Sequence, residues 1–91
     1  MNELYNVRLS PGATTSVQER LPENVAAAVI EFVIGTLRSN PRRVGKPLSR
    51  ELRGRYSARR GAFRIIYSID DAEQLITVLR IEHRADVYRP R

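Results

Sequence analysis

The sequence predicts an α+β domain in which helices cover one face of a single, mostly antiparallel sheet. Apolar residues recur at helical spacing only in the first half of the chain, whereas alternating apolar and polar residues dominate the second half. Helical segments followed by a run of strands are typical of this class. Because the chain has 91 residues, we expect a single small domain that spans residues 1–91.

The first half predicts a strand followed by a helical hairpin. Alternation over 5–9 indicates the strand, and Ser10-Pro11 is a start signal for a weak helix over 10–20. Pro22 opens a stronger helix over 22–39, which Asn40-Pro41 ends. Its apolar stripe is formed by Val25, Val29, Phe32, Val33 and Leu37.

The second half predicts a basic loop and a three-stranded antiparallel meander. The loop covers 41–51, and the strands cover 52–59, 62–69 and 75–84. Arg60-Gly61 forms a tight connection between the first two strands, and 70–73 forms a polar turn between the last two.

The positive charge of the chain is concentrated in one stretch. The formal net charge is +6, from 16 Lys and Arg against 10 Asp and Glu. Ten basic residues and one acid, Glu51, lie between Arg38 and Arg64, so this stretch carries +9 and the rest of the chain −3. Such localised charge favours contact with a polyanion. The preference for arginine fits either a GC-rich genome or bidentate recognition of phosphate.

Strand parity predicts that arginines gather on the sheet face opposite the helices, because successive side chains point to opposite faces. A charged sheet face is often merely solvated. Here, however, Glu82 is its only balancing acid, and like charges on neighbouring strands destabilise a sheet. We therefore expect a polyanion site with an apolar floor of Ile66 and Val78, surrounded by Arg55, Arg59, Arg64, Arg80 and Arg84.

The composition excludes several other classes of protein. With no Cys and one His, a disulfide scaffold, thiol catalysis and a multi-histidine metal site are ruled out. The chain contains neither an apolar run long enough to span a membrane nor a recognisable signal peptide. A cytoplasmic protein without a membrane role is therefore expected.

Several short motifs, in this order and spacing, together resemble the RelE/ParE toxin superfamily. They are Gly45-Lys46-Pro47-Leu48, Leu52-Arg53-Gly54, Tyr56-Ser57-Ala58-Arg59-Arg60-Gly61, Phe63-Arg64-Ile65-Ile66-Tyr67-Ser68-Ile69, and His83-Arg84 with Tyr88. The resemblance spans essentially the whole chain and looks closest to actinobacterial RelE members.

This resemblance implies the toxin component of a type II toxin–antitoxin system. RelE toxins are endoribonucleases that cut mRNA in the ribosomal A site without a metal or other cofactor, through attack of the 2′-hydroxyl on the adjacent phosphate. The implied partners are a RelB-like antitoxin, the ribosome and mRNA, with operator DNA contacted only through the antitoxin complex.

The family motifs assign roles to individual residues. Arg64 matches the arginine of a Gly-aromatic-Arg element, here one residue looser as Gly61-Ala62-Phe63-Arg64, and is expected to clamp the transition-state phosphate. Arg84 matches the arginine after the last strand and is expected to hold either the same phosphate or the leaving group that carries the 5′-oxygen. Tyr88 matches a C-terminal tyrosine that stacks on or orients the base, or else packs structurally.

The groups that transfer protons depart from the family pattern. Ser57 and Arg59 stand where other RelE toxins carry lysines; Arg59 can stabilise charge but is effectively always protonated. His83 is the one side chain that titrates near neutrality. Parity puts His83 on the core side, so a catalytic role requires a strand end or bulge after Glu82.

The remaining cations are expected to bind RNA or ribosomal phosphates, or else to keep the protein soluble: Lys46, Arg42, Arg43, Arg50, Arg55 and Arg80.

Two alternative functions stay open from the sequence. A ParE-like toxin has the same fold but inhibits DNA gyrase and does not cut RNA. A non-toxic nucleic-acid-binding module is weaker, since the helices are the less basic part of the chain and nothing resembles a recognition helix.

Overall fold

The computed structural model describes residues 4–83, and within them five strands form one sheet in the order β1-β5-β4-β3-β2. β1 pairs parallel with β5, and every other pairing is antiparallel. This arrangement confirms the predicted mostly antiparallel α+β class. The strands are β1 (Asn6–Leu9), β2 (Lys46–Pro47), β3 (Arg55–Arg60), β4 (Phe63–Asp70) and β5 (Leu75–His83).

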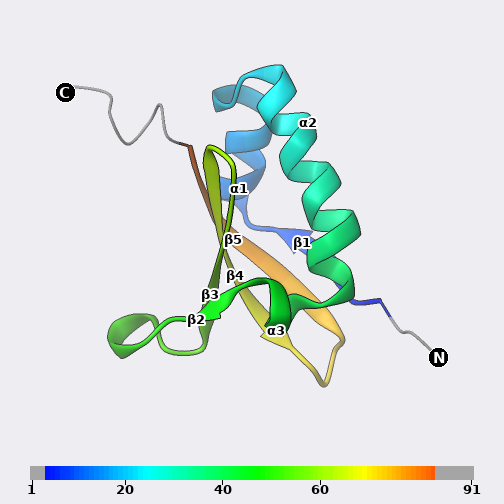
Figure 1. The fold of residues 1–91 in the computed structure, drawn as a ribbon, viewed down its shortest axis with the longest axis vertical. Coiled ribbons are helices and arrows are strands. Elements are labelled where there is room, and N and C mark those ends of the chain that lie inside the picture. The colour runs from blue at the N-terminus through cyan, green and yellow to red at the C-terminus, as the bar shows by residue number, and fades with distance from the viewer. Residues whose placement is uncertain (1–3, 84–91) are drawn as a thin grey trace.

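A helical hairpin covers one face of the sheet (Figure 1). α1 (Pro11–Thr15) continues into a widened π-type turn, η1 (Ser16–Arg20), and α2 (Glu23–Phe32) continues into a second such turn, η2 (Val33–Leu37). Ser10 caps α1 as predicted, since its hydroxyl oxygen accepts a hydrogen bond from the Ala13 backbone nitrogen at 3.1 Å.

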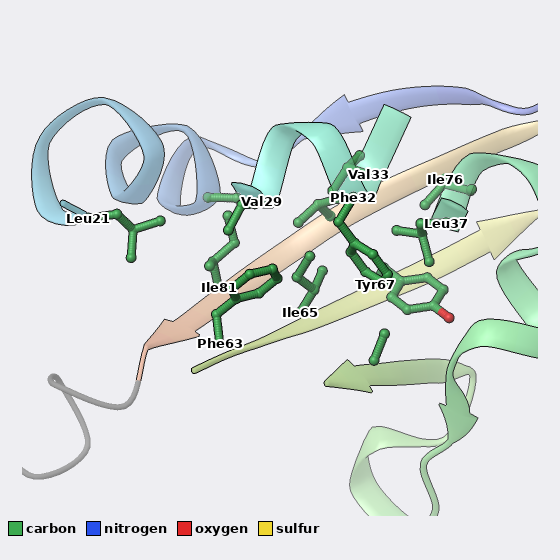
Figure 2. Close-up of a cluster of buried hydrophobic side chains, with 13 residues drawn as sticks. Leu21, Val29, Phe32, Val33, Leu37, Phe63, Ile65, Tyr67, Ile76 and Ile81 are labelled. Atoms are coloured by element: carbon green, nitrogen blue, oxygen red, sulfur yellow. The ribbon is translucent and has the colours of Figure 1, made fainter. Parts of the chain in front are cut away.

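The core lies between this hairpin and the sheet (Figure 2). Four of the five predicted stripe residues are buried, and Val25 packs against them half-buried. Phe32 meets Phe63 edge to face, with ring centroids 6.2 Å apart. The buried apolar side chains are Ala13, Leu21, Val29, Phe32, Val33, Leu37, Ala58, Phe63, Ile65, Tyr67, Ile76, Val78 and Ile81.

The predicted basic loop contains more structure than its sequence indicates. A short helix α3 (Pro41–Val44) leads directly into edge strand β2, and a 3₁₀ turn, η3 (Arg50–Leu52), follows. The expected strand over 52–59 therefore begins only at Arg55. Arg50 and Gly54 have φ values of 61° and 92°, which are incompatible with an extended strand at those positions.

A β-bulge at Leu79 reverses the predicted parity in the first part of the last strand, up to Val78, whereas the parity predicted from Arg80 onward holds. Ile66 pairs with Arg80 and Tyr67 with Val78, so Leu79 has no partner in β4. Its carbonyl instead accepts a hydrogen bond from the Ser10 hydroxyl at 2.9 Å. The extra residue places both Val78 and Ile81 in the core, so Val78 does not form the apolar floor with Ile66 that the sequence predicts.

Candidate nucleic-acid interface

The face of the sheet turned away from α1 and α2, called the outer face below, carries six cationic side chains. Directly paired residues in a sheet share a face, so the register identifies its members. Arg59 pairs with Arg64, which pairs with Glu82, and these three residues form one row across β3, β4 and β5. The cations are Arg8, Lys46, Arg55, Arg59, Arg64 and Arg80.

A second row crosses four strands beside the first. Lys46 pairs with Ser57, Ser57 with Ile66, and Ile66 with Arg80. Ile66 is half-buried while the two cations at the ends of the row are exposed. The row therefore combines an apolar floor with positive charge at both sides.

The third row adds a cation that the sequence analysis missed. Arg8 lies beside Thr77 in the parallel β1–β5 pair, and Arg55 lies beside Ser68 in the β3–β4 pair. Alternation over 5–9 did indicate that Arg8 points away from Val7 and Leu9. The pairing of β1 with β5 could not be derived from this alternation, because it depends on contacts distant in sequence.

Glu82 is held between two of these arginines. Its Oε1 atom lies 3.6 Å from Arg64 Nη1, and its Oε2 atom lies 3.2 Å from Arg80 Nε. The Glu82 side chain is 26% exposed, against 47% for Arg64 and 70% for Arg80. Both arginines thus keep exposed surface on which an anion can bind.

His83 lies on the helix-covered side of the sheet. It pairs with Phe63, whose side chain is buried in the core, and β5 continues through His83 without a bulge after Glu82. Arg60 shares this side, with its guanidinium carbon 4.9 Å from the Phe32 ring centroid. The described structure therefore does not bring His83 to the arginines of the outer face, and its catalytic role stays a prediction.

Arg42 is engaged in a contact that the sequence did not reveal. Its two terminal nitrogens donate to the Asp71 carboxylate at 2.9 and 2.7 Å, and the Tyr5 hydroxyl donates to the same carboxylate at 2.7 Å. The hydrogen bonds from Arg42 and Tyr5 lower the pKa of Asp71. This cluster joins α3 to the turn between β4 and β5, apart from the outer-face cations.

The other predicted residues lie in three places. Arg43 is exposed on α3, and Arg50 is exposed in the loop between β2 and β3, which extends away from the sheet (Figure 1). Arg84 and Tyr88 lie outside the described residues.

Within residues 4–83 no group of three or more acidic or histidine side chains could hold a metal ion. The same residues include no helix of sufficient length and apolarity to cross a membrane.

Comparison with known proteins identifies the family of this chain. A sequence model of the ParE toxins of type II toxin–antitoxin systems matches residues 7–88. The chain belongs to this toxin family. It is also 49% identical over 85 residues to the toxin RelG of Mycobacterium tuberculosis, covering 93% of this chain and 97% of RelG. Toxin RelE of the same organism is 46% identical over 85 residues, covering 93% of this chain and 87% of RelE.

Solved structures agree with this assignment. A chain of the toxin–antitoxin complex RelBE2 from M. tuberculosis has a TM-score of 0.87 and 46% identity, covering 90% of this chain and 100% of its own. The archaeal RelE–RelB complex from Pyrococcus horikoshii gives a TM-score of 0.68 at 25% identity, covering 90% of this chain and 97% of its own. The protein is therefore a RelE-type toxin of a type II toxin–antitoxin system.

Proposed function

We propose that this toxin is a ribosome-dependent endoribonuclease that cleaves mRNA in the A site and thereby inhibits translation. The observation that carries this proposal is the paired arginines of the outer face, Arg59 and Arg64, with Arg80 joined to Arg64 through Glu82. Guanidinium groups bind phosphate oxygens in bidentate geometry, and close to one another they match the charge of a phosphorane.

The proposed reaction needs no redox or covalent chemistry from the protein. The 2′-oxygen attacks the adjacent phosphorus, and the 5′-oxygen leaves, producing a 2′,3′-cyclic phosphate and a 5′-hydroxyl. Arg64 and Arg59 would stabilise the negative charge that grows on the non-bridging oxygens. Arg84 and Tyr88 are proposed, respectively, to hold the same phosphate and to stack on the base. This division of roles is compatible with catalysis independent of a metal.

The wider basic surface is proposed to hold the ribosome–mRNA complex. Arg8, Arg55 and Lys46 extend the outer face, and Arg43 and Arg50 project from α3 and from the loop after β2. These exposed cations suit contacts with RNA phosphates, which give strongly salt-dependent binding. Arg42 would contribute mainly by fixing α3, because Asp71 already engages its guanidinium.

An antitoxin of the RelB type is the proposed protein partner, and operator DNA would be contacted only through that complex. Two of the similar solved structures are toxin–antitoxin complexes by name. Both curated relatives are named RelG or RelE toxins, which favours the ribosomal activity over gyrase inhibition. A cytoplasmic location follows from this proposed site of action.

Purified toxin added to translating ribosomes on a defined mRNA tests the proposal, with new 5′ ends mapped by primer extension. We expect A-site ends with the wild-type protein and at least a 100-fold lower rate with Arg64→Ala, because an interaction made in the transition state is lost. Arg20→Ala, which removes an exposed cation in η1 away from the sheet, serves as the matched control.

Two results would contradict the proposal. Folded, growth-arresting toxin that leaves the mRNA intact would exclude cleavage, and inhibition of supercoiling by gyrase would then support the ParE activity. Equal cleavage by Arg64→Ala and wild type would exclude the outer-face arginines as the site.

A further inference from the structure

Lys46 is the single lysine among the 16 Lys and Arg residues of the chain. The structure places it in edge strand β2, paired with Ser57, with its side chain on the outer face. It is exposed, and within residues 4–83 it takes part in no ion pair. Its ammonium group is thus available to a ligand of this face.

The position of Lys46 is close to the arginine row. Arg59 lies two residues along β3 from Ser57, which makes it the diagonal neighbour of Lys46. Such neighbours are separated by about 7–8 Å, within reach of two long side chains. A phosphate held by Arg59 and Arg64 can therefore also contact the Lys46 ammonium.

The local fold fixes this position. Gly45 approaches β3 so closely that a Cβ atom there would lie 2.9 Å from the Ser57 carbonyl oxygen and would overlap the Tyr67 hydroxyl. That hydroxyl donates a hydrogen bond to the Pro41 carbonyl at 2.5 Å. The Arg42–Asp71 pair holds the preceding helix from its other side. Together these contacts hold β2, and with it Lys46, against β3.

The other described side chains of this face are poor proton donors to a leaving oxygen. A guanidinium group is a poor proton donor, and the Ser57 hydroxyl is a weak acid. The Glu82 carboxylate is already engaged in ion pairs with Arg64 and Arg80. His83 lies on the opposite side of the sheet. A lysine ammonium, by contrast, is protonated at neutral pH and can release its proton.

We propose that Lys46 is the general acid that protonates the leaving 5′-oxygen, an inference that rests on the proposed function. The 2′-oxygen forms a bond to phosphorus as the bond from phosphorus to the 5′-oxygen breaks. A proton passes from Lys46 Nζ to the 5′-oxygen, and the 2′-hydroxyl proton passes to solvent water. The neutral amine then regains a proton from solvent, so the enzyme returns to its starting state.

A sulfur-substituted substrate separates proton donation from simple binding. Programmed ribosomes carry mRNA in which the 5′-oxygen at the cut bond is either normal or replaced by sulfur, and single-turnover cleavage is measured with saturating toxin. A thiolate leaves without needing a proton. Lys46→Arg keeps the positive charge but removes a usable proton donor, and its thermal unfolding is compared with wild type.

With the oxygen substrate we expect Lys46→Arg to be slower than wild type by about 10²- to 10⁴-fold, the usual contribution of a general acid. With the sulfur substrate, the cleavage rate of Lys46→Arg should lie within about tenfold of the wild-type rate. Arg64→Ala should instead cleave both substrates slowly. Arg20→Ala is expected to match wild type on both.

Equal losses on the two substrates would overturn the inference and assign Lys46 to binding alone. Full activity of Lys46→Arg on the oxygen substrate would also overturn it, since charge would then suffice. A wild-type toxin that cleaves neither substrate would instead refute the proposed ribonuclease function itself.

Discussion

Glu82 sets how much positive charge the outer face presents, because its carboxylate contacts both Arg64 and Arg80. At the scale of single residues, it competes with any phosphate for these two guanidinium groups. Replacing it with glutamine removes the competing charge while preserving the shape of the side chain.

Glu82→Gln is expected to bind single-stranded RNA several-fold more tightly at low salt, with the difference shrinking as salt rises. Fluorescence anisotropy of a labelled RNA over a salt series measures the effect. Glu31→Gln, on the exposed side of α2, changes the net charge equally and is the control. An identical gain from both variants would show that total charge, and not this pair of arginines, controls affinity.

The buried Tyr67 hydroxyl leads us to expect that the protein becomes less stable at alkaline pH. Burial raises the pKa of its hydroxyl to about 12, above an ordinary value of 10.0. The folded state holds this proton more tightly than the unfolded state. The protonated Tyr67 hydroxyl therefore makes its full contribution to the free energy of unfolding below about pH 10. This contribution is then lost as pH rises toward 12, at no more than about 1.4 kcal/mol per pH unit.

Tyr67→Phe should cost about 1–3 kcal/mol at pH 7, since the Pro41 carbonyl loses its hydrogen-bond donor. In urea unfolding experiments, the difference in free energy of unfolding between wild type and variant should become smaller between pH 10 and 12. A gap that stays constant over this range would contradict the predicted titration.

At the scale of elements, β2 depends on the absence of a side chain at Gly45. Gly45→Ala should destabilise the protein by about 1–3 kcal/mol, because the added methyl group overlaps the Tyr67 hydroxyl and crowds the Ser57 carbonyl. Gly35→Ala, which faces open space within the second helix, should instead stabilise by up to about 1 kcal/mol. Urea unfolding of both variants measures these changes. If Gly45→Ala has the same free energy of unfolding as wild type, Gly45 does not approach Ser57 and Tyr67 as closely as the structure indicates.

The elements also show how far the sequence could be interpreted. Apolar spacing was sufficient to predict the helical hairpin and all three long strands, because each buries a continuous stripe of its own. It failed at Val78, which it placed on the outer face, since the bulge at Leu79 adds a residue without changing the local alternation. It also missed β2, whose two residues pair with β3 only because Gly45 permits the approach.

At the scale of the whole molecule, the two faces of the sheet have different roles. The helical hairpin buries one face, and the outer face keeps its cations exposed. Parity correctly placed Arg55, Arg59, Arg64 and Arg80 together, because β3 and β4 alternate regularly and Arg80 follows the bulge, where the predicted parity of β5 holds. Arg8 and Lys46 joined them only through pairings between segments distant in sequence.

The most direct test of the central claim uses mRNA with a single 2′-deoxynucleotide on the 5′ side of the bond that is cut in the A site. The claim is that the outer face promotes attack by the 2′-hydroxyl. Wild-type toxin should therefore cleave the all-ribose mRNA on programmed ribosomes and leave the substituted bond intact. Cleavage of the substituted bond at a comparable rate would contradict the account.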